Sequence, residues 1–158
     1  MRFAYYGKSI LRREKSKSEI LAAELMSTKT NIPVPVQYGA GLVSLGPYSV
    51  YQYAEGMLLS KMLAGPDNEY HSILRPDTSE DELLRAYQAM ADIHPELNSH
   101  SCPSIGSVSF NPGTWKVHNW PYTMNIDMLI RIANVPPTAF KLDSFTRVTE
   151  YFCNLAEH

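Results

Sequence analysis

The sequence predicts an α+β fold, in which a small antiparallel sheet with one packed helix is followed by a mainly helical region. Residues 1–54 place stretches rich in β-forming residues on both sides of a single run of helix formers. The stretches that follow are longer, and their apolar side chains recur at helical spacing. The length of 158 residues suits one domain or two small lobes, and a hydrophobic content of 44% is enough for a core.

The segment from Lys15 to Gly39 organises the first part of the chain. Ser16 and Glu19 have the S-x-x-E spacing of a capping box, which predicts a helix over Ser16–Met26. The Ile32-Pro33-Val34-Pro35 sequence that follows must be extended, because proline fixes φ and restricts the residue before it. Strands are therefore predicted around this helix at Arg2–Tyr6, Val36–Val43 and Tyr48–Ala54.

The second part is predicted to be mainly helical. Its longest helix should begin after Thr78 as N-cap, and Pro95 should kink or end it near Ile93. Residues 101–119 are expected to be irregular, with short extended pieces at 105–110 and 114–118. Other helices are predicted at Met57–Leu63, at Met124–Ile132 and from a cap at Ser144 to the last residue, so that both ends of the chain look cut.

Composition limits the partners of the protein. The formal net charge of -2 gives no reason to expect nucleic acid, and no run of about 18 apolar residues predicts a transmembrane helix. The first ten residues do not form a signal peptide, because Arg2 and Lys8 interrupt a short apolar stretch. Two cysteines, Cys102 and Cys153, fit a reducing compartment, and a cytoplasmic location is expected.

Most chemical motifs are missing from the sequence. It has no Walker loop and no G-x-G-x-x-G motif, and its five histidines lack metal-ligand spacing. Asp92 and Glu96 are four residues apart, but a solvated helix face explains them better than acid-base chemistry does. The basic group within residues 7–15 is interpreted as a solvated loop.

Arg2 and Glu19 form a more informative pair. Protein kinases hold nucleotide phosphates with a cation on a strand that pairs with a carboxylate on the following helix. Arg2 on the first strand and Glu19 on the next helix match that order, and we expect them to approach within salt-bridge range. The alternative is that Glu19 is only the acid of the capping box and Arg2 a charge at a strand edge.

Seven stretches of the chain carry a resemblance to a known family. They are MRF, EKSKSEILAAELM, NIPVPVQYG, LGPYSVYQYAEG, DELLRAYQAMADIHPELNSHSCPSIGSVSF, GTWKVHNWPYTMNIDMLIRIANVPPTAF and SFTRVTEYFCNLAEH. In this order and spacing they resemble the fungal aminoglycoside phosphotransferase-like kinases, a branch of the protein-kinase-like fold. The resemblance implies a partial N-terminal lobe with its hinge at 1–56 and a partial helical C-terminal lobe at 57–158.

The resemblance also implies a nucleotide site. Arg2 stands in the usual place of the phosphate-binding lysine, and Glu19 in that of its carboxylate partner. In the hinge strand, Gln52 and Ala54 would offer a backbone carbonyl and a backbone N–H to adenine, with Tyr51 at the pocket wall. Plain strand packing is the alternative for the tyrosines of this strand. The complete family fold uses ATP and magnesium to phosphorylate a small-molecule hydroxyl or a similar acceptor.

The chain departs from the family pattern in the parts that do chemistry. The Gly-rich cover of the phosphates, the catalytic loop with its Asp and Asn, and the later magnesium-binding Asp have no counterpart in the sequence. No catalytic and no metal-binding residue is therefore assigned, and the chain is expected to be inactive by itself. A non-catalytic kinase-like binding module and a fragment without function remain alternatives, and the acceptor stays open.

Overall fold

The computed structural model describes residues 1–4, 7, 9–64 and 73–158, and these form two compact units. Unit 1 combines Met1–Gln52 with Ser101–His158, and unit 2 is Tyr53–His100. The predicted division into lobes at residue 56 differs from this grouping and stays a prediction about a kinase-like arrangement.

The larger sheet of unit 1 is antiparallel and has the strand order β1-β3-β2. This confirms the predicted α+β class with a small antiparallel sheet, although the strands are shorter than expected. Pairing between the second and third strands continues by one hydrogen bond beyond their ends, in which the Gln52 N–H donates to the Val36 carbonyl at 2.7 Å. Of the predicted first strand, Tyr5 and Tyr6 lie outside the described residues. The strands are β1 (Arg2–Phe3), β2 (Gln37–Val43) and β3 (Gly46–Tyr51).

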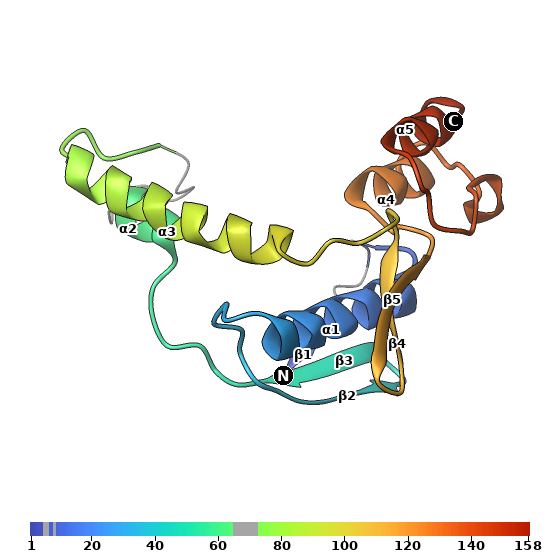
Figure 1. The fold of residues 1–158 in the computed structure, drawn as a ribbon, viewed down its shortest axis with the longest axis horizontal. Coiled ribbons are helices and arrows are strands. Elements are labelled where there is room, and N and C mark those ends of the chain that lie inside the picture. Colours follow the sequence, from blue (N-terminus) through green and yellow to red (C-terminus); the bar gives the residue numbers. More distant parts are fainter. Residues whose placement is uncertain (5–6, 8, 65–72) are drawn as a thin grey trace. The chain divides into compact units, whose positions relative to one another are not determined.

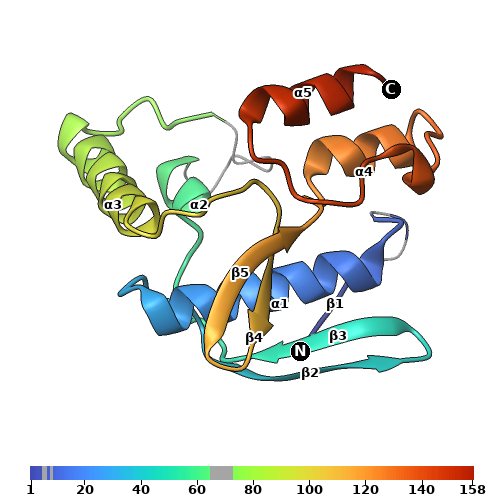
Figure 2. The same ribbon diagram turned by 45° about the vertical axis from the view of Figure 1, so that its right-hand side comes forward.

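Helix α1 (Arg12–Lys29) lies against β3 and β2, as predicted for the helix of the first part (Figures 1 and 2). Its predicted start at Ser16 is wrong, because the helix begins four residues earlier and Leu11 is its N-cap. The S-x-x-E pattern therefore lies within the helix and not at its end. The charged residues 12–15 are good helix formers, which explains why they extend the helix instead of forming the expected loop.

The C-terminal end of α1 also differs from the prediction. The expected stop at Ser27 and Thr28 is wrong, because both residues stay helical and donate their hydroxyl hydrogens to the Glu24 carbonyl. Such bonds to the preceding turn satisfy the hydroxyl without breaking the helix. The extended Thr30, whose N–H still donates to the Met26 carbonyl, ends it.

The second half of unit 1 begins with a hairpin where mostly irregular structure was expected. Strands β4 (Ser107–Asn111) and β5 (Thr114–Asn119) pair antiparallel, and α1 packs against β4. Just before β4, Ile105 exchanges two backbone hydrogen bonds with Phe145, at 2.7 and 2.9 Å. This bridge ties the hairpin to the helical end of the chain.

The core of unit 1 lies around two short helices. Helix α4 (Met124–Arg131) agrees with its prediction, whereas α5 (Val148–Ala156) begins after Arg147 and not after the predicted cap at Ser144. The Asp143 carboxylate accepts from the Ser144 N–H in the loop before it. The buried core side chains are Ile126, Ile130, Phe140, Phe145 and Tyr151.

Unit 2 contains helices α2 (Leu59–Ala64) and α3 (Glu80–Asn98). A capping box is present at the start of α3, but Ser79 forms it with Glu82, one residue after the predicted cap at Thr78. Of the two effects expected of Pro95, an end near Ile93 is wrong, since the helix runs through Pro95 to Asn98; a kink stays a prediction. The N–H that proline lacks would have donated to the Ala91 carbonyl, so α3 continues through Pro95 without that one hydrogen bond.

Candidate functional site

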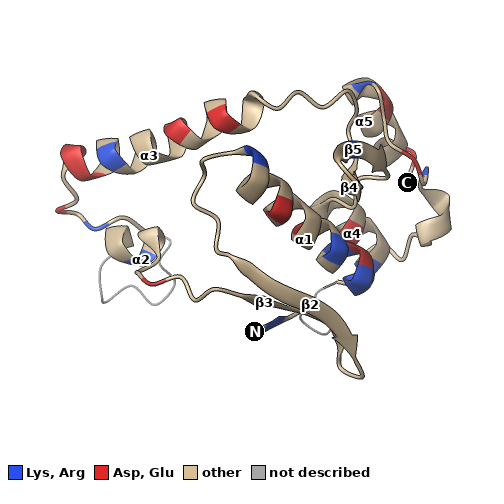
Figure 3. Ribbon diagram, turned by 60° about the horizontal axis from the view of Figure 1, so that its bottom comes forward, with Lys and Arg blue, Asp and Glu red and all other residues tan. Residues whose placement is uncertain are grey.

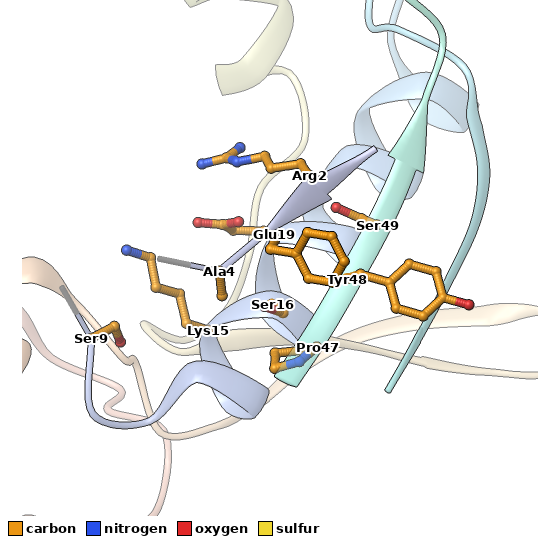
Figure 4. Close-up of a pocket in the computed structure, with 10 residues that line it drawn as sticks. Arg2, Ala4, Ser9, Lys15, Ser16, Glu19, Pro47, Tyr48 and Ser49 are labelled. Carbon is orange, nitrogen blue, oxygen red and sulfur yellow. The ribbon is translucent and has the colours of Figure 1, made fainter. Parts of the chain in front are cut away.

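A cavity of about 270 Å³ lies between β1, β3 and the first half of α1 (Figure 4). It lies within unit 1, and more than half of its lining residues have polar side chains. Its lining residues are Arg2, Phe3, Ala4, Ser9, Lys15, Ser16, Glu19, Pro47, Tyr48 and Ser49.

Strand register and helical spacing position these side chains. Antiparallel pairing sets Arg2 opposite Ser49, so the N-terminal strand brings a cation to a strand that has none of its own. Figure 3 shows that β2 and β3 are free of charged residues, whereas α1 carries several. On α1, Lys15 and Glu19 are four residues apart and therefore share one face of the helix.

The cavity brings together both residues of the predicted charge pair. Arg2 and Glu19 both line it, and their side chains point to the same side of the sheet (Figure 4). The predicted salt bridge between them is wrong, however, because no ion pair within 4.0 Å joins these two described residues. Both side chains are exposed, and water competes well for charges in that environment.

The predicted hinge residues do not line this cavity. Tyr51 pairs with Gln37 at the end of β3, and Gln52 is exposed with its N–H bonded to Val36. Ala54 is exposed and belongs to unit 2. Within unit 1, Tyr51 and Gln52 are therefore not part of the cavity that Arg2 and Glu19 line, and the role of the three hinge residues in adenine binding stays a prediction.

Of the lining residues that the sequence did not indicate, three bear most directly on the site. Lys15 was assigned to a loop, and its i,i+4 spacing to Glu19 becomes meaningful only because the helix starts at Arg12. Tyr48 was interpreted as a strand residue. Ser9 carries no local signal, since its hydrogen-bonding partner is 113 residues away.

Ser9 belongs to a hydrogen-bonded group that links the cavity to the core of unit 1. Its hydroxyl lies 3.0 Å from the hydroxyl of Tyr122, which in turn donates to the Asp127 carboxylate. Asp127 is buried and also faces the Arg131 guanidinium, with an Nε–Oδ2 distance of 3.7 Å. Burial, and secondarily the hydrogen bond to Asp127, raise the pKa of the Tyr122 phenol above its ordinary value.

Comparison of the chain with family models, characterised proteins and solved structures found no match. Within the residues that the structure describes, no group of three or more His, Cys, Asp or Glu side chains could hold a metal ion. None of the helices in the described ranges is both long and apolar enough to cross a membrane.

Proposed function

We propose that the chain binds the phosphate groups of a nucleotide in the cavity between β1, β3 and α1, as part of an aminoglycoside phosphotransferase-like kinase. The observation that carries this proposal is that Arg2 and Glu19, from a strand and from the helix that follows it, line one cavity with Lys15. Two cations beside a single carboxylate suit an anionic ligand, and arginine is well adapted to phosphate. We propose the protein-kinase-like fold of the chain together with this function.

The absence of an ion pair between the described Arg2 and Glu19 leaves the guanidinium available to such a ligand. In kinases the carboxylate orients the cation that contacts the phosphates, and both must be in place for activity. A phosphate that binds to Arg2 and Lys15 would draw the guanidinium and the ammonium together, with Glu19 holding them from the helix. The cavity of about 270 Å³ accommodates the phosphate-bearing end of a nucleotide and not the whole molecule.

Magnesium, which the family uses, fits the described residues poorly. Glu19 is the sole carboxylate lining the cavity as described, whereas magnesium in kinases is held by an Asp and an Asn in addition to the phosphates. We therefore derive no step through a protein-bound metal.

Binding without catalysis is the expected behaviour of this chain. No Asp in the sequence stands in an H-x-D-x-x-x-x-N context, so a residue that orients the acceptor hydroxyl is missing. Losing a general base alone costs roughly 10²–10⁴-fold in rate. The absent motif favours a second candidate function, a non-catalytic kinase-like module that binds nucleotide without transferring phosphate.

Calorimetric titration with ATP tests the proposal. We expect Arg2→Ala to weaken binding by about 10- to 100-fold, because a charge-assisted hydrogen bond to phosphate contributes roughly 1.5–3 kcal/mol. Arg13→Ala is the matched control, since Arg13 is an exposed arginine of α1 that does not line the cavity. Equal affinities of the two variants, or no binding by the unmodified chain, would contradict a phosphate site at Arg2.

Phosphate transfer is measured separately. The purified chain, incubated with ATP, magnesium and a panel of amino sugars and hydroxyl compounds, should release no more ADP than a control without protein. Release above that control, abolished by Arg2→Ala, would show that the chain is an active phosphotransferase with a base of a different kind.

A further inference from the structure

Ser9 lines the candidate cavity, and its hydroxyl contacts Tyr122, which packs against the core of unit 1. The residue is 7% exposed, and its Oγ lies 3.0 Å from the Tyr122 hydroxyl. The neighbouring Leu11 packs against the core cluster, which fixes this part of the chain beside Tyr122. Ser9 is therefore a positioned polar group rather than a mobile one.

The direction of the hydrogen bonds follows from counting protons. The Tyr122 phenol has a single hydrogen, and it donates that hydrogen to the Asp127 carboxylate. In its contact with Ser9, the phenol oxygen can then only accept, so Ser9 must donate. The one hydroxyl hydrogen of Ser9 points toward Tyr122, so the hydroxyl can offer only lone pairs to a ligand.

We propose that Ser9 makes this cavity selective for small phosphorylated compounds that carry a hydroxyl group near the phosphate, such as sugar phosphates, over phosphate groups without such a donor. The inference rests on the proposed function, because it takes Arg2 and Lys15 as the groups that attract the phosphate. A ligand hydroxyl next to that phosphate donates to the Ser9 oxygen. A phosphate oxygen placed there would meet lone pairs and no hydrogen.

Burial strengthens this preference. A buried acceptor that receives no hydrogen bond loses its hydration without compensation, whereas one that receives a hydroxyl hydrogen regains it. The net gain of one such bond corresponds to about 2- to 10-fold in affinity. The cavity of about 270 Å³ has room for a phosphate together with a small sugar.

Two phosphate monoesters of equal charge, ribose 5-phosphate and methyl phosphate, provide the test by NMR titration of the full chain. The unmodified chain should bind ribose 5-phosphate about 2- to 10-fold more tightly than methyl phosphate. Tyr122→Phe removes the acceptor of the Ser9 hydrogen and keeps the ring that packs against Trp120. The freed Ser9 hydrogen can then turn toward the cavity, so affinity for methyl phosphate should rise and the preference should shrink.

Ser9→Ala should also abolish the preference, while Ser9→Thr, which keeps the hydroxyl, should retain it. Tyr38→Phe removes a 68% exposed phenol outside the cavity and should change neither affinity. If circular dichroism shows that Tyr122→Phe does not fold, the Ser9 variants decide. Equal binding of the two esters by the unmodified chain, or an unchanged preference in Ser9→Ala, would overturn the inference. If Arg2→Ala weakens the binding of both esters but the unmodified chain binds them equally, only the inference on Ser9 fails. If Arg2→Ala changes the affinity for neither ester, the proposed phosphate site fails as well.

Discussion

The Tyr122 phenol couples the ionisation of one side chain to the stability of unit 1. Because burial raises its pKa in the folded protein above the ordinary value of 10.0, the folded chain holds this proton more tightly than the unfolded chain. The contribution of the protonated phenol to the free energy of unfolding is fully present below pH 10, and it is lost as the pH rises through the pKa of the folded state. We expect the free energy of unfolding to fall with pH above 10.

The control for this prediction is a phenylalanine that cannot ionise. Denaturant unfolding of Tyr122→Phe should show a smaller decrease in the free energy of unfolding between pH 9 and pH 11 than that of Tyr38→Phe, which removes an exposed phenol. Identical pH dependence in both variants would mean that the phenol of Tyr122 is not shifted by the fold.

Two isoleucines of helix α4 separate buried from exposed positions. Ile126 is 1% exposed and belongs to the core cluster, whereas Ile132, at the C-cap, is 67% exposed. Ile126→Ala should lower the free energy of unfolding by about 2–5 kcal/mol, and Ile132→Ala by no more than about 0.5 kcal/mol. Urea denaturation measures both, and a similar loss in the two variants would show that α4 does not form the core.

At the scale of elements, the entry into β4 depends on a glycine. A Cβ at Gly106 would meet the backbone carbonyl of Asn119, and it would also lie 3.1 Å from side-chain atoms of Val117 and Ser144. A backbone atom cannot rotate away as a side chain can. We expect Gly106→Ala to lower the free energy of unfolding by about 3 kcal/mol.

Gly39 in β2 is the matched position, because a Cβ there would meet nothing within 4 Å. Thermal unfolding should show a clear decrease in melting temperature for Gly106→Ala and little change for Gly39→Ala. If Gly106→Ala is tolerated as well as Gly39→Ala, the close approach of residue 106 to β5 is wrong.

Elements with strong local signals were predictable from the sequence, and their boundaries were less so. The two prolines and the β-forming residues of the first part predicted β2 and β3, because these effects act within a few residues. The start of α1 was missed because the S-x-x-E pattern occurs within helices as well as at their ends. Pro95 did not end α3 as expected, because proline removes one hydrogen bond without preventing the residues on both sides of it from being helical.

Only the part of the candidate site that follows from the order of elements along the chain was predictable from the sequence. A strand followed by a packed helix places Arg2 and Glu19 on one side of a sheet, and the sequence contains that order. The distance between their charged groups depends on side-chain rotamers, which the sequence does not specify. The link from Ser9 to Tyr122 joins residues 113 positions apart, so only the folded structure reveals it.

At the scale of the whole molecule, buried side chains are concentrated in one part of the chain. Five of the six buried apolar residues identified in the described ranges surround α4 and α5, and the 19-residue helix α3 of unit 2 has none. Amide hydrogens of α4 and α5 should therefore exchange more slowly than those of α3, because local opening is easiest where little apolar surface is buried. Hydrogen exchange followed by mass spectrometry measures this, and equal protection of α3 would indicate that its apolar face is covered.

Unit 1 is assembled from two stretches of chain that unit 2 separates. During synthesis on a ribosome, α1 and the first sheet emerge well before β4, which packs on α1. The core around α4 and α5 is made last, so the early part must wait with its contact surface uncovered while some fifty further residues are added. Contacts between distant residues form slowly, and nascent chains in this state are prone to aggregate. Production of the protein in cells should therefore benefit from slow translation and from chaperones that bind exposed apolar segments.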